Sequence, residues 1–202
     1  SSSASWLTYE AARKMKATPL GPPAYEGLPK HVSDDIPGYA CAISTIMFDQ
    51  LFMESALFYA RASTGPLGLV NRGQLAPAPA AVIGCDMLKS FAFVQIDYPA
   101  RKVVLSSTVG YTPGGNLLAS APLIETQGAL SVMGFVDGQP QAIILDTAGD
   151  YEFAMEKAPD TPVRQISLGD LVFRQTPAVG SLDYGLGMPD APRMGNRLLG
   201  KF

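Results

Sequence analysis

One nine-residue pattern occurs twice in this 202-residue chain, at positions 83–91 and 194–202. Both copies read apolar-Gly-x-x-apolar-Leu-x-x-Phe, and both come after a loop that contains proline and alanine. The apolar residue and the glycine suit a buried strand end with a close backbone approach, and the residues after them suit a short helix whose Leu and Phe face inward. The repeated pattern therefore predicts two related structural units in one chain.

The composition indicates that these units are built from strands. The 20 glycines and 17 prolines make the chain rich in turns, which favours many short strands over long helices. Hydrophobic residues make up 47% of the chain and charged residues 16%, which suffices for a packed core. The net charge of −3 argues against a nucleic-acid partner, and no apolar run is long enough to cross a bilayer.

Local patterns predict three hairpins and one helix. The hairpins are expected at 93–105, at 130–145 and at 166–173, with turns at Pro99–Lys102, Asp137-Gly138 and Gly169-Asp170. An Asp-Gly pair between two apolar runs is a strong hairpin signal. The helix is expected over 9–15, where Ala11, Ala12 and Met15 can share one face.

The segment that carries chemistry is Ile143-Ile144-Leu145-Asp146-Thr147-Ala148-Gly149. It places a carboxylate directly after a run of residues typical of a buried strand. Such a carboxylate costs free energy unless it is hydrogen-bonded or functional. Taken alone, the segment also fits a strand that ends in an ordinary Asp-Thr turn.

The segment gains meaning from a second stretch later in the chain. Asp146-Thr147-Ala148, together with Met194–Leu199, resembles the paired signature of the pepsin and retropepsin superfamily of aspartic peptidases. The separation of 49 residues (195 − 146) from Asp146 to Gly195 suits one compact lobe. The resemblance covers 125–202 and 75–105, whereas 20–70 contributes little. Ala148 departs from the family pattern, which usually has Gly there, although Gly149 comes directly after it.

The resemblance implies an all-β fold with short helices, formed by two retropepsin-like acid-protease β-barrel lobes of the bacterial tandem type. The expected lobes span 1–108 and 125–202, with a linker at 109–124. Gly84 and Gly195 would support equivalent positions in the two lobes.

The activity that the resemblance implies is that of an aspartic endopeptidase. Asp146 would be one member of an aspartate pair that shares a proton and activates a water molecule. Thr147 would brace the two catalytic loops through its hydroxyl, and Ala148 and Gly149 would complete the loop. The substrate would be a polypeptide bound as an extended strand, with no cofactor. No metal is expected, since His31 is the single histidine of the chain.

The aspartate of the first lobe is not evident in the sequence. Asp34-Asp35 and Asp49 do not lie in an Asp-Thr/Ser-Gly segment. We expect the missing motif immediately before Ser1, because 1–15 resembles what family members carry just after it. Without such a motif the monomer would hold one catalytic aspartate, and homodimerisation through the second lobe would be needed to form the pair.

Several other features leave alternatives open. A flap that closes over the substrate is expected in the first lobe, with Tyr25 and Tyr39 as its candidate aromatics, although either also fits an ordinary loop or strand tyrosine. Cys41 and Cys85 would form one disulfide or, as we favour, two buried thiols. Export through a targeting segment upstream of Ser1 is favoured as the localisation.

Two rival hypotheses remain at the level of sequence. The first is a catalytically inactive retropepsin-like module for peptide binding or assembly, which Ala148 and the missing first aspartate favour. The second is an unrelated β-barrel in which the motifs are coincidental.

Overall fold

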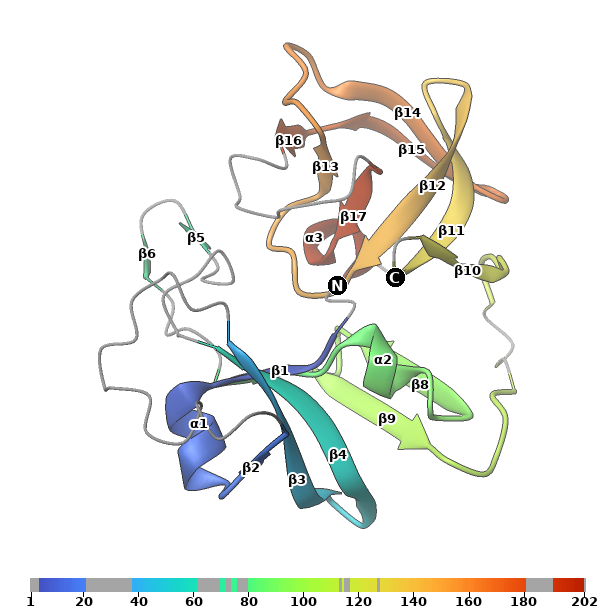
Figure 1. The fold of residues 1–202 in the computed structure, drawn as a ribbon. Helices are drawn as coiled ribbons and strands as arrows, with labels where there is room; N and C mark the ends of the chain where they lie inside the picture. The colour runs from blue at the N-terminus through green and yellow to red at the C-terminus, as the bar shows by residue number, and fades with distance from the viewer. Residues whose placement is uncertain are drawn as a thin grey trace. The chain divides into compact units, whose positions relative to one another are not determined.

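The computed structural model describes residues 4–20, 38–61, 70–71, 74–75, 80–112, 114, 117–126, 128–180 and 191–201. The described residues form strands with a few short helices between them (Figure 1), which confirms the predicted all-β fold class. They divide into two compact units, an N-terminal unit of Ala4–Gly84 and a C-terminal unit that begins at Cys85. Residues 85–108, assigned to the first lobe by the sequence, thus group with the C-terminal unit.

The N-terminal unit is built on a five-stranded sheet in the order β2-β3-β4-β1-β7. Within this sheet β1 runs parallel to β4 and antiparallel to β7. A separate two-stranded sheet pairs β5 with β6. The strands of the unit are β1 Trp6–Thr8, β2 Thr18–Pro19, β3 Tyr39–Phe48, β4 Leu51–Arg61, β5 Val70–Asn71, β6 Gln74–Leu75 and β7 Ala81–Val82.

The predicted helix is present as α1, Tyr9–Lys14. The hydroxyl of Thr8 caps it by accepting a hydrogen bond from the backbone N–H of Ala11 at 3.1 Å. Ala11 and Ala12 are buried, whereas Met15, which was expected to share a face with them, is 42% exposed. The helix ends at Lys14, and Met15 is the C-cap residue at which the chain leaves the helical periodicity.

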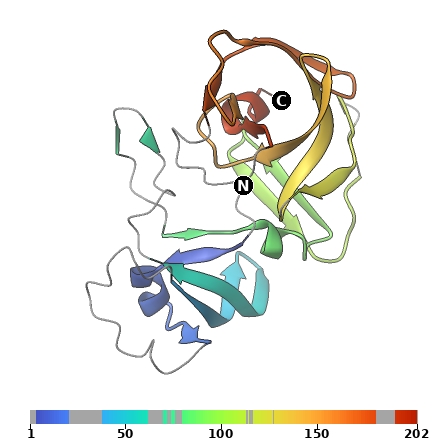
Figure 2. The same cartoon turned by 45° about the horizontal axis from the view of Figure 1, so that its top comes forward.

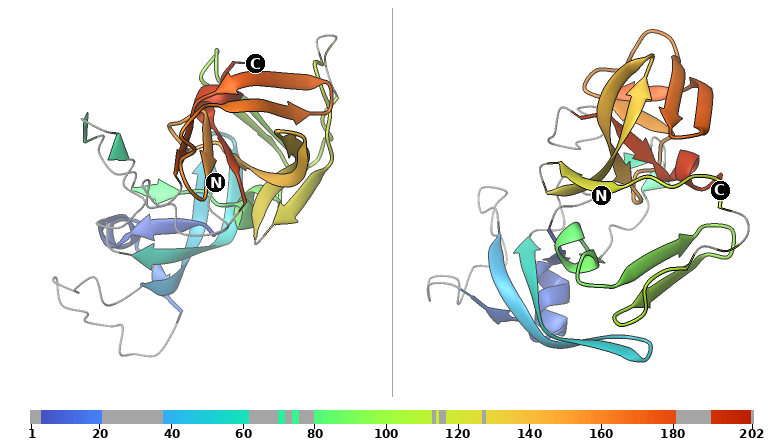
Figure 3. Two further views of the ribbon diagram at one scale, coloured as in Figure 1. Left: turned by 90° about the horizontal axis from the view of Figure 1, so that it is seen from above. Right: turned by 90° about the vertical axis from the view of Figure 1, so that its right-hand side faces the viewer.

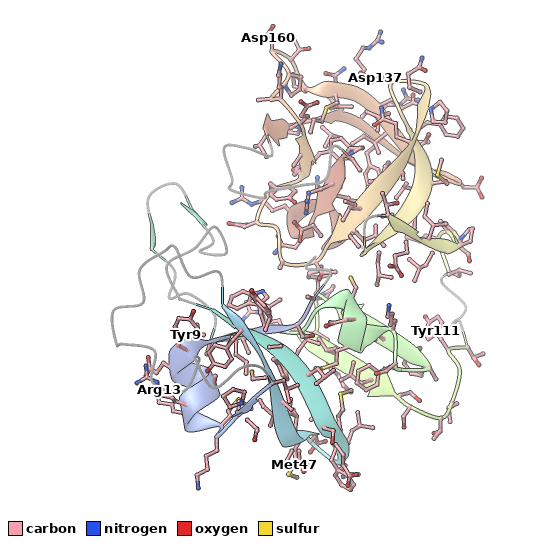
Figure 4. The ribbon with its side chains drawn as sticks, viewed as in Figure 1. Tyr9, Arg13, Met47, Tyr111, Asp137 and Asp160 are labelled. Carbon is pink, nitrogen blue, oxygen red and sulfur yellow. The ribbon has the colours of Figure 1, made fainter. Side chains whose placement is uncertain are left out.

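Strands β3 and β4 form a long hairpin, seen clearly in the right-hand view of Figure 3. One face of this hairpin packs into the core of the unit through Cys41 and Ile43 of β3 and Phe58 of β4. Near the hairpin turn, Met47 (labelled in Figure 4) is largely exposed. The alternation of buried and exposed residues is that of a sheet with one face packed and one face open.

Both cysteines are buried thiols, and Cys41 stands opposite Phe58 in the pairing of β3 with β4. Burial raises the pKa of the Cys41 thiol, which disfavours the reactive thiolate. We expect the folded protein to resist alkylation and the unfolded protein to take up two labels, as measured by intact mass without reductant. An unfolded chain that takes up no label would indicate a disulfide instead.

The C-terminal unit contains an eight-stranded sheet with the path β15-β14-β11-β12-β17-β13-β16, to which β10 adds beside β11. Figure 2 shows this sheet curled into a nearly closed barrel. A second, two-stranded sheet pairs β8 with β9. The strands are β8 Phe93–Asp97, β9 Lys102–Ser106, β10 Leu123–Thr126, β11 Ala129–Val136, β12 Gln139–Asp146, β13 Phe153–Met155, β14 Val163–Leu168, β15 Leu171–Thr176, β16 Ala178–Gly180 and β17 Arg193–Gly195.

All three predicted hairpins are confirmed, as β8–β9, β11–β12 and β14–β15. The turn between β11 and β12 has positive φ angles at both Asp137 (49°) and Gly138 (83°). These angles are those of the primed turns that match the twist of paired strands, which is why an Asp-Gly pair is favoured there. Strand β10 was not predicted, because it crosses the end of the expected linker at residue 124 and has no strong alternation.

The two copies of the repeated pattern form short helices, α2 at Cys85–Leu88 and α3 at Asn196–Leu199. Met87 and Leu198 are buried, whereas Leu88 and Leu199, the leucines expected to face inward, are half-buried. A helix of four residues offers one narrow face to the core, and the residue before the leucine occupies that face. The core of the barrel is formed by Val132, Val136, Ile143, Phe153, Val163, Ile166, Leu168, Met194 and Leu198.

Candidate active site

Asp146 is the last residue of β12 and is 3% exposed. Strand β12 lies in the middle of the barrel sheet, between β11 and β17, and Asp146 stands opposite Gly195 in the parallel register. Side chains alternate along a strand, so Asp146 points away from the face on which Ile143 joins the barrel core. The carboxylate is thus buried without being part of the hydrophobic core.

The loop after Asp146 turns sharply back on itself. The backbone N–H of Gly149 donates to the Asp146 carbonyl at 3.1 Å, and the N–H of Ala148 points to Oδ1 of the same residue at 3.4 Å. Ala148 is exposed and is not among the residues with a positive φ. The departure from the family's Gly therefore introduces neither backbone strain nor a buried methyl group in this unit.

Gly149 and Gly195 leave room for the side chain and backbone of Tyr151. A Cβ atom on Gly195 would lie 2.2 Å from the Tyr151 carbonyl oxygen and 2.7 Å from Cδ2 of its ring. A Cβ atom on Gly149 would lie 2.5 Å from Cε1 of the same ring. No real Cβ atom tolerates such distances, so both positions require glycine to admit this tyrosine.

Tyr151 is 3% exposed and donates a hydrogen bond from its hydroxyl to Oδ2 of Asp146 at 2.5 Å. Burial raises the pKa of the Asp146 carboxyl. The charge and hydrogen bond of the amino terminus, then the bond from Tyr151 and the charge of Arg193, lower it, and the pKa ends below its usual value. The carboxyl group is therefore held in the ionised form.

Two further side chains have an electrostatic interaction with Asp146. Arg193 is 5% exposed in β17, opposite Ile144 of β12, and therefore lies on the same face of the sheet as Asp146. Tyr98, just after β8, has a pKa raised by burial and, to a lesser degree, by the negative charge of Asp146. Its buried hydroxyl has no hydrogen-bond partner among the described residues.

Ion pairs join the Asp146 loop to α3. Arg197 donates two hydrogen bonds to the Asp150 carboxylate, at 2.8 and 3.1 Å, and Lys201 reaches Glu152 at 3.2 Å. Backbone bonds reinforce the link, since the Asn196 N–H donates to the Gly149 carbonyl at 2.8 Å. Partly exposed pairs contribute about 1 kcal/mol or less each, so their main effect is on the geometry of the loop.

Gly84 has an environment in the N-terminal unit that parallels that of Gly195. A Cβ atom on Gly84 would lie 2.3 Å from the carbonyl carbon of Ala4, and the Gly84 N–H donates to the Ser5 hydroxyl at 2.8 Å. In both units, therefore, the glycine of the repeated pattern lies directly against the backbone of a segment earlier in the chain, Tyr151 for Gly195 and Ala4 for Gly84.

The remaining candidates from the sequence fall elsewhere. Tyr39 is the first residue of β3, pairs with Ala60 and stacks on the ring of Tyr9 with centroids 5.8 Å apart, which is a position within the sheet and not at a hairpin turn. Asp49 lies in the turn between β3 and β4. Tyr25, His31 and the Asp34-Asp35 pair lie outside the described residues.

Three residues around Asp146 were missed by sequence reasoning. Arg193 could have been noticed in the sequence, because a charged residue directly before the apolar strand end at Met194-Gly195 is as unusual as a carboxylate after a buried strand. Tyr151 lies five residues after Asp146 and could have been noted as a polar aromatic inside the motif loop. Tyr98 had no local signal, because only the fold brings it near Asp146.

Among the described residues, no three His, Cys, Asp or Glu side chains gather closely enough to hold a metal ion. No helix in the described ranges is long and apolar enough to span a membrane.

The C-terminal unit is thus a small β-barrel with one buried, hydrogen-bonded carboxylate in a strand-end loop. No protein-family model matches the chain, and no curated protein matches it. Among solved structures it is similar to a retropepsin-like aspartic protease from Rickettsia conorii, at 19% identity over 41% of this chain and 81% of that chain, with a TM-score of 0.29. At this score the likeness does not identify a family.

Proposed function

We propose that this chain is an aspartic endopeptidase, in which Asp146 and a second aspartate activate water against a peptide bond. The observation that carries the proposal is Asp146 itself, a carboxylate 3% exposed at the end of β12, opposite Gly195 and held by the Tyr151 hydroxyl. A buried carboxylate with a specific hydrogen-bond partner is a candidate for a functional group.

The registers of the two units support a duplicated framework. In the C-terminal unit β13 pairs with β17, which sets Gly195 opposite Glu152, and the Gly195 N–H donates to the Glu152 carbonyl at 2.9 Å. In the N-terminal unit β1 pairs with β7 in the same antiparallel sense, which sets Gly84 opposite Ala4. By these pairings Gly84 and Gly195 hold similar places in the two units.

The second carboxylate of the proposed pair would come from a longer chain. An Asp-Thr/Ser-Gly segment upstream of Ser1 would supply it, as the sequence resemblance implies. Thr147 as a brace between the catalytic loops and Tyr25 as a flap residue belong to the same proposal.

The chemistry depends on two carboxyl groups that share one proton. As the water oxygen bonds to the peptide carbonyl carbon, the ionised carboxylate accepts one proton from water, and the protonated carboxyl donates to the carbonyl oxygen. The substrate would bind as an extended polypeptide, with its backbone paired and alternate side chains in pockets. No cofactor takes part.

The alternative is a retropepsin-like module that binds peptides or assembles without cleaving them. One observation favours it: Oδ2 of Asp146 is already engaged by Tyr151, so the carboxylate has a structural partner and need not be catalytic.

The test is cleavage of a peptide library at acidic and neutral pH by protein that includes the residues upstream of Ser1. Cleavage that a pepstatin-type inhibitor blocks would support the peptidase. Folded protein that cleaves nothing at either pH, yet retains extended peptides in a binding assay, would support the non-catalytic module.

A further inference from the structure

The hydrogen bond between Tyr151 and Asp146 joins the last residue of β12 to the loop that follows it. The hydroxyl lies 2.5 Å from Oδ2, and neither residue is more than 3% exposed. A phenol donates to a carboxylate and has a much higher ordinary pKa, so the proton stays on the tyrosine over the acidic and neutral range. The bond therefore favours the ionised carboxylate.

The tyrosine ring is held in place before any substrate binds. Gly149 and Gly195 lie against the ring so closely that a methyl group at either position would overlap it. The backbone of Tyr151 is fixed as well, since its carbonyl accepts from the Arg197 N–H at 3.2 Å. Gly149, Gly195 and the start of α3 thus hold the Tyr151 ring in this orientation.

The other groups that face Asp146 come from different elements. Arg193 of β17 adds positive charge and favours ionisation, in the same direction as Tyr151. Tyr98, beside the β8–β9 hairpin, interacts with Asp146 through its charge without an assigned hydrogen bond to it. Tyr151 is thus distinguished from Tyr98 by a directional bond.

We propose that Tyr151 is a positioning residue, which orients the carboxyl group of Asp146 and makes it the proton-accepting member of the aspartate pair. The paired carboxyl then carries the shared proton. The catalytic part of this role rests on the proposed peptidase function, whereas the bond and its effect on Asp146 do not.

The test is a carboxyl ¹³C NMR titration of protein labelled at aspartate, with Asp146 assigned by its loss in Asp146→Asn. In Tyr151→Phe the titration midpoint of Asp146 is expected to move to higher pH, because a donor to the charged form is lost. In the matched control Tyr98→Phe it is expected to stay where it is in the parent protein. If cleavage is observed, the acidic limb of the kcat/KM profile should move with the midpoint in Tyr151→Phe.

An unchanged midpoint in Tyr151→Phe, or an equal shift in Tyr98→Phe, would overturn the proposal. Should Tyr151→Phe fail to fold, the proposal is tested on the parent protein through the hydroxyl proton of Tyr151. A slowly exchanging Tyr151 hydroxyl proton that disappears as Asp146 is protonated supports the proposal, and its absence at neutral pH overturns it. If the protein cleaves no peptide but the Asp146 midpoint shifts, the proposed peptidase function is refuted and the role of the Tyr151 bond stands. If the protein cleaves peptides but the midpoint does not shift, only the role of Tyr151 is refuted.

Discussion

Replacing Asp146 with asparagine is expected to lower peptide-bond cleavage by about 10³-fold, the scale of a lost acid–base group. An amide can neither accept the proton of the attacking water nor share a proton with a second carboxyl. The fold should survive, because the asparagine amide oxygen can still accept from the Tyr151 hydroxyl. Both quantities are measurable on one preparation, as kcat/KM on a library-derived peptide and as the midpoint of urea unfolding.

The matched control is Asp160→Asn, which removes the same charge at an exposed position between β13 and β14 (Figure 4). Its kcat/KM is expected to match that of the parent protein. If Asp146→Asn cleaved as fast as Asp160→Asn, the assignment of Asp146 as a catalytic residue would be wrong.

Replacing Gly195 with alanine is expected to destabilise the protein by about 3 kcal/mol, the upper end of what an overpacked site costs. The new methyl carbon would lie 2.2 Å from the Tyr151 carbonyl oxygen and 2.8 Å from that of Gly149. Both obstacles are backbone atoms, so no side-chain rotation relieves the overlap. Gly84→Ala meets the Ala4 carbonyl carbon at 2.3 Å, and we expect a comparable loss from the N-terminal unit.

Gly110→Ala is the control for both substitutions. A Cβ atom at Gly110 would have nothing within 4 Å, so the change in the free energy of unfolding should stay within about 0.5 kcal/mol. Urea unfolding of the three variants would compare the two glycines that contact backbone atoms with Gly110, which has open space around it. Equal stability of Gly195→Ala and Gly110→Ala would mean that the close approach of β17 to the Asp146 loop is absent.

Features that depend on neighbouring residues could be predicted from the sequence. The Asp137-Gly138 turn and its flanking strands arise from backbone preferences and period-two alternation, both of which act over a few residues. The two glycine-and-helix segments could be aligned because each repeats the same short pattern. A carboxylate after a buried run marked Asp146, and the resemblance of its segment and of Met194–Leu199 to a paired signature made it the catalytic candidate.

The same logic failed where chain ends or long-range packing decide exposure. Met15 has the helical spacing of a buried residue, yet it lies past the end of α1 and is exposed. Strand β10 is specified by pairing with β11 and not by its own pattern.

By itself, therefore, the sequence determined the all-β class, the hairpins, the requirement for glycine at two repeated positions and the choice of Asp146. Only the tertiary structure decided which groups surround that carboxylate. Arg193 reaches it through the parallel pairing of β12 with β17, and Tyr98 through the packing of a hairpin 48 residues earlier in the chain (146 − 98). Such neighbours are set by strand order and register, because residues distant along the chain meet only after the whole sheet has closed.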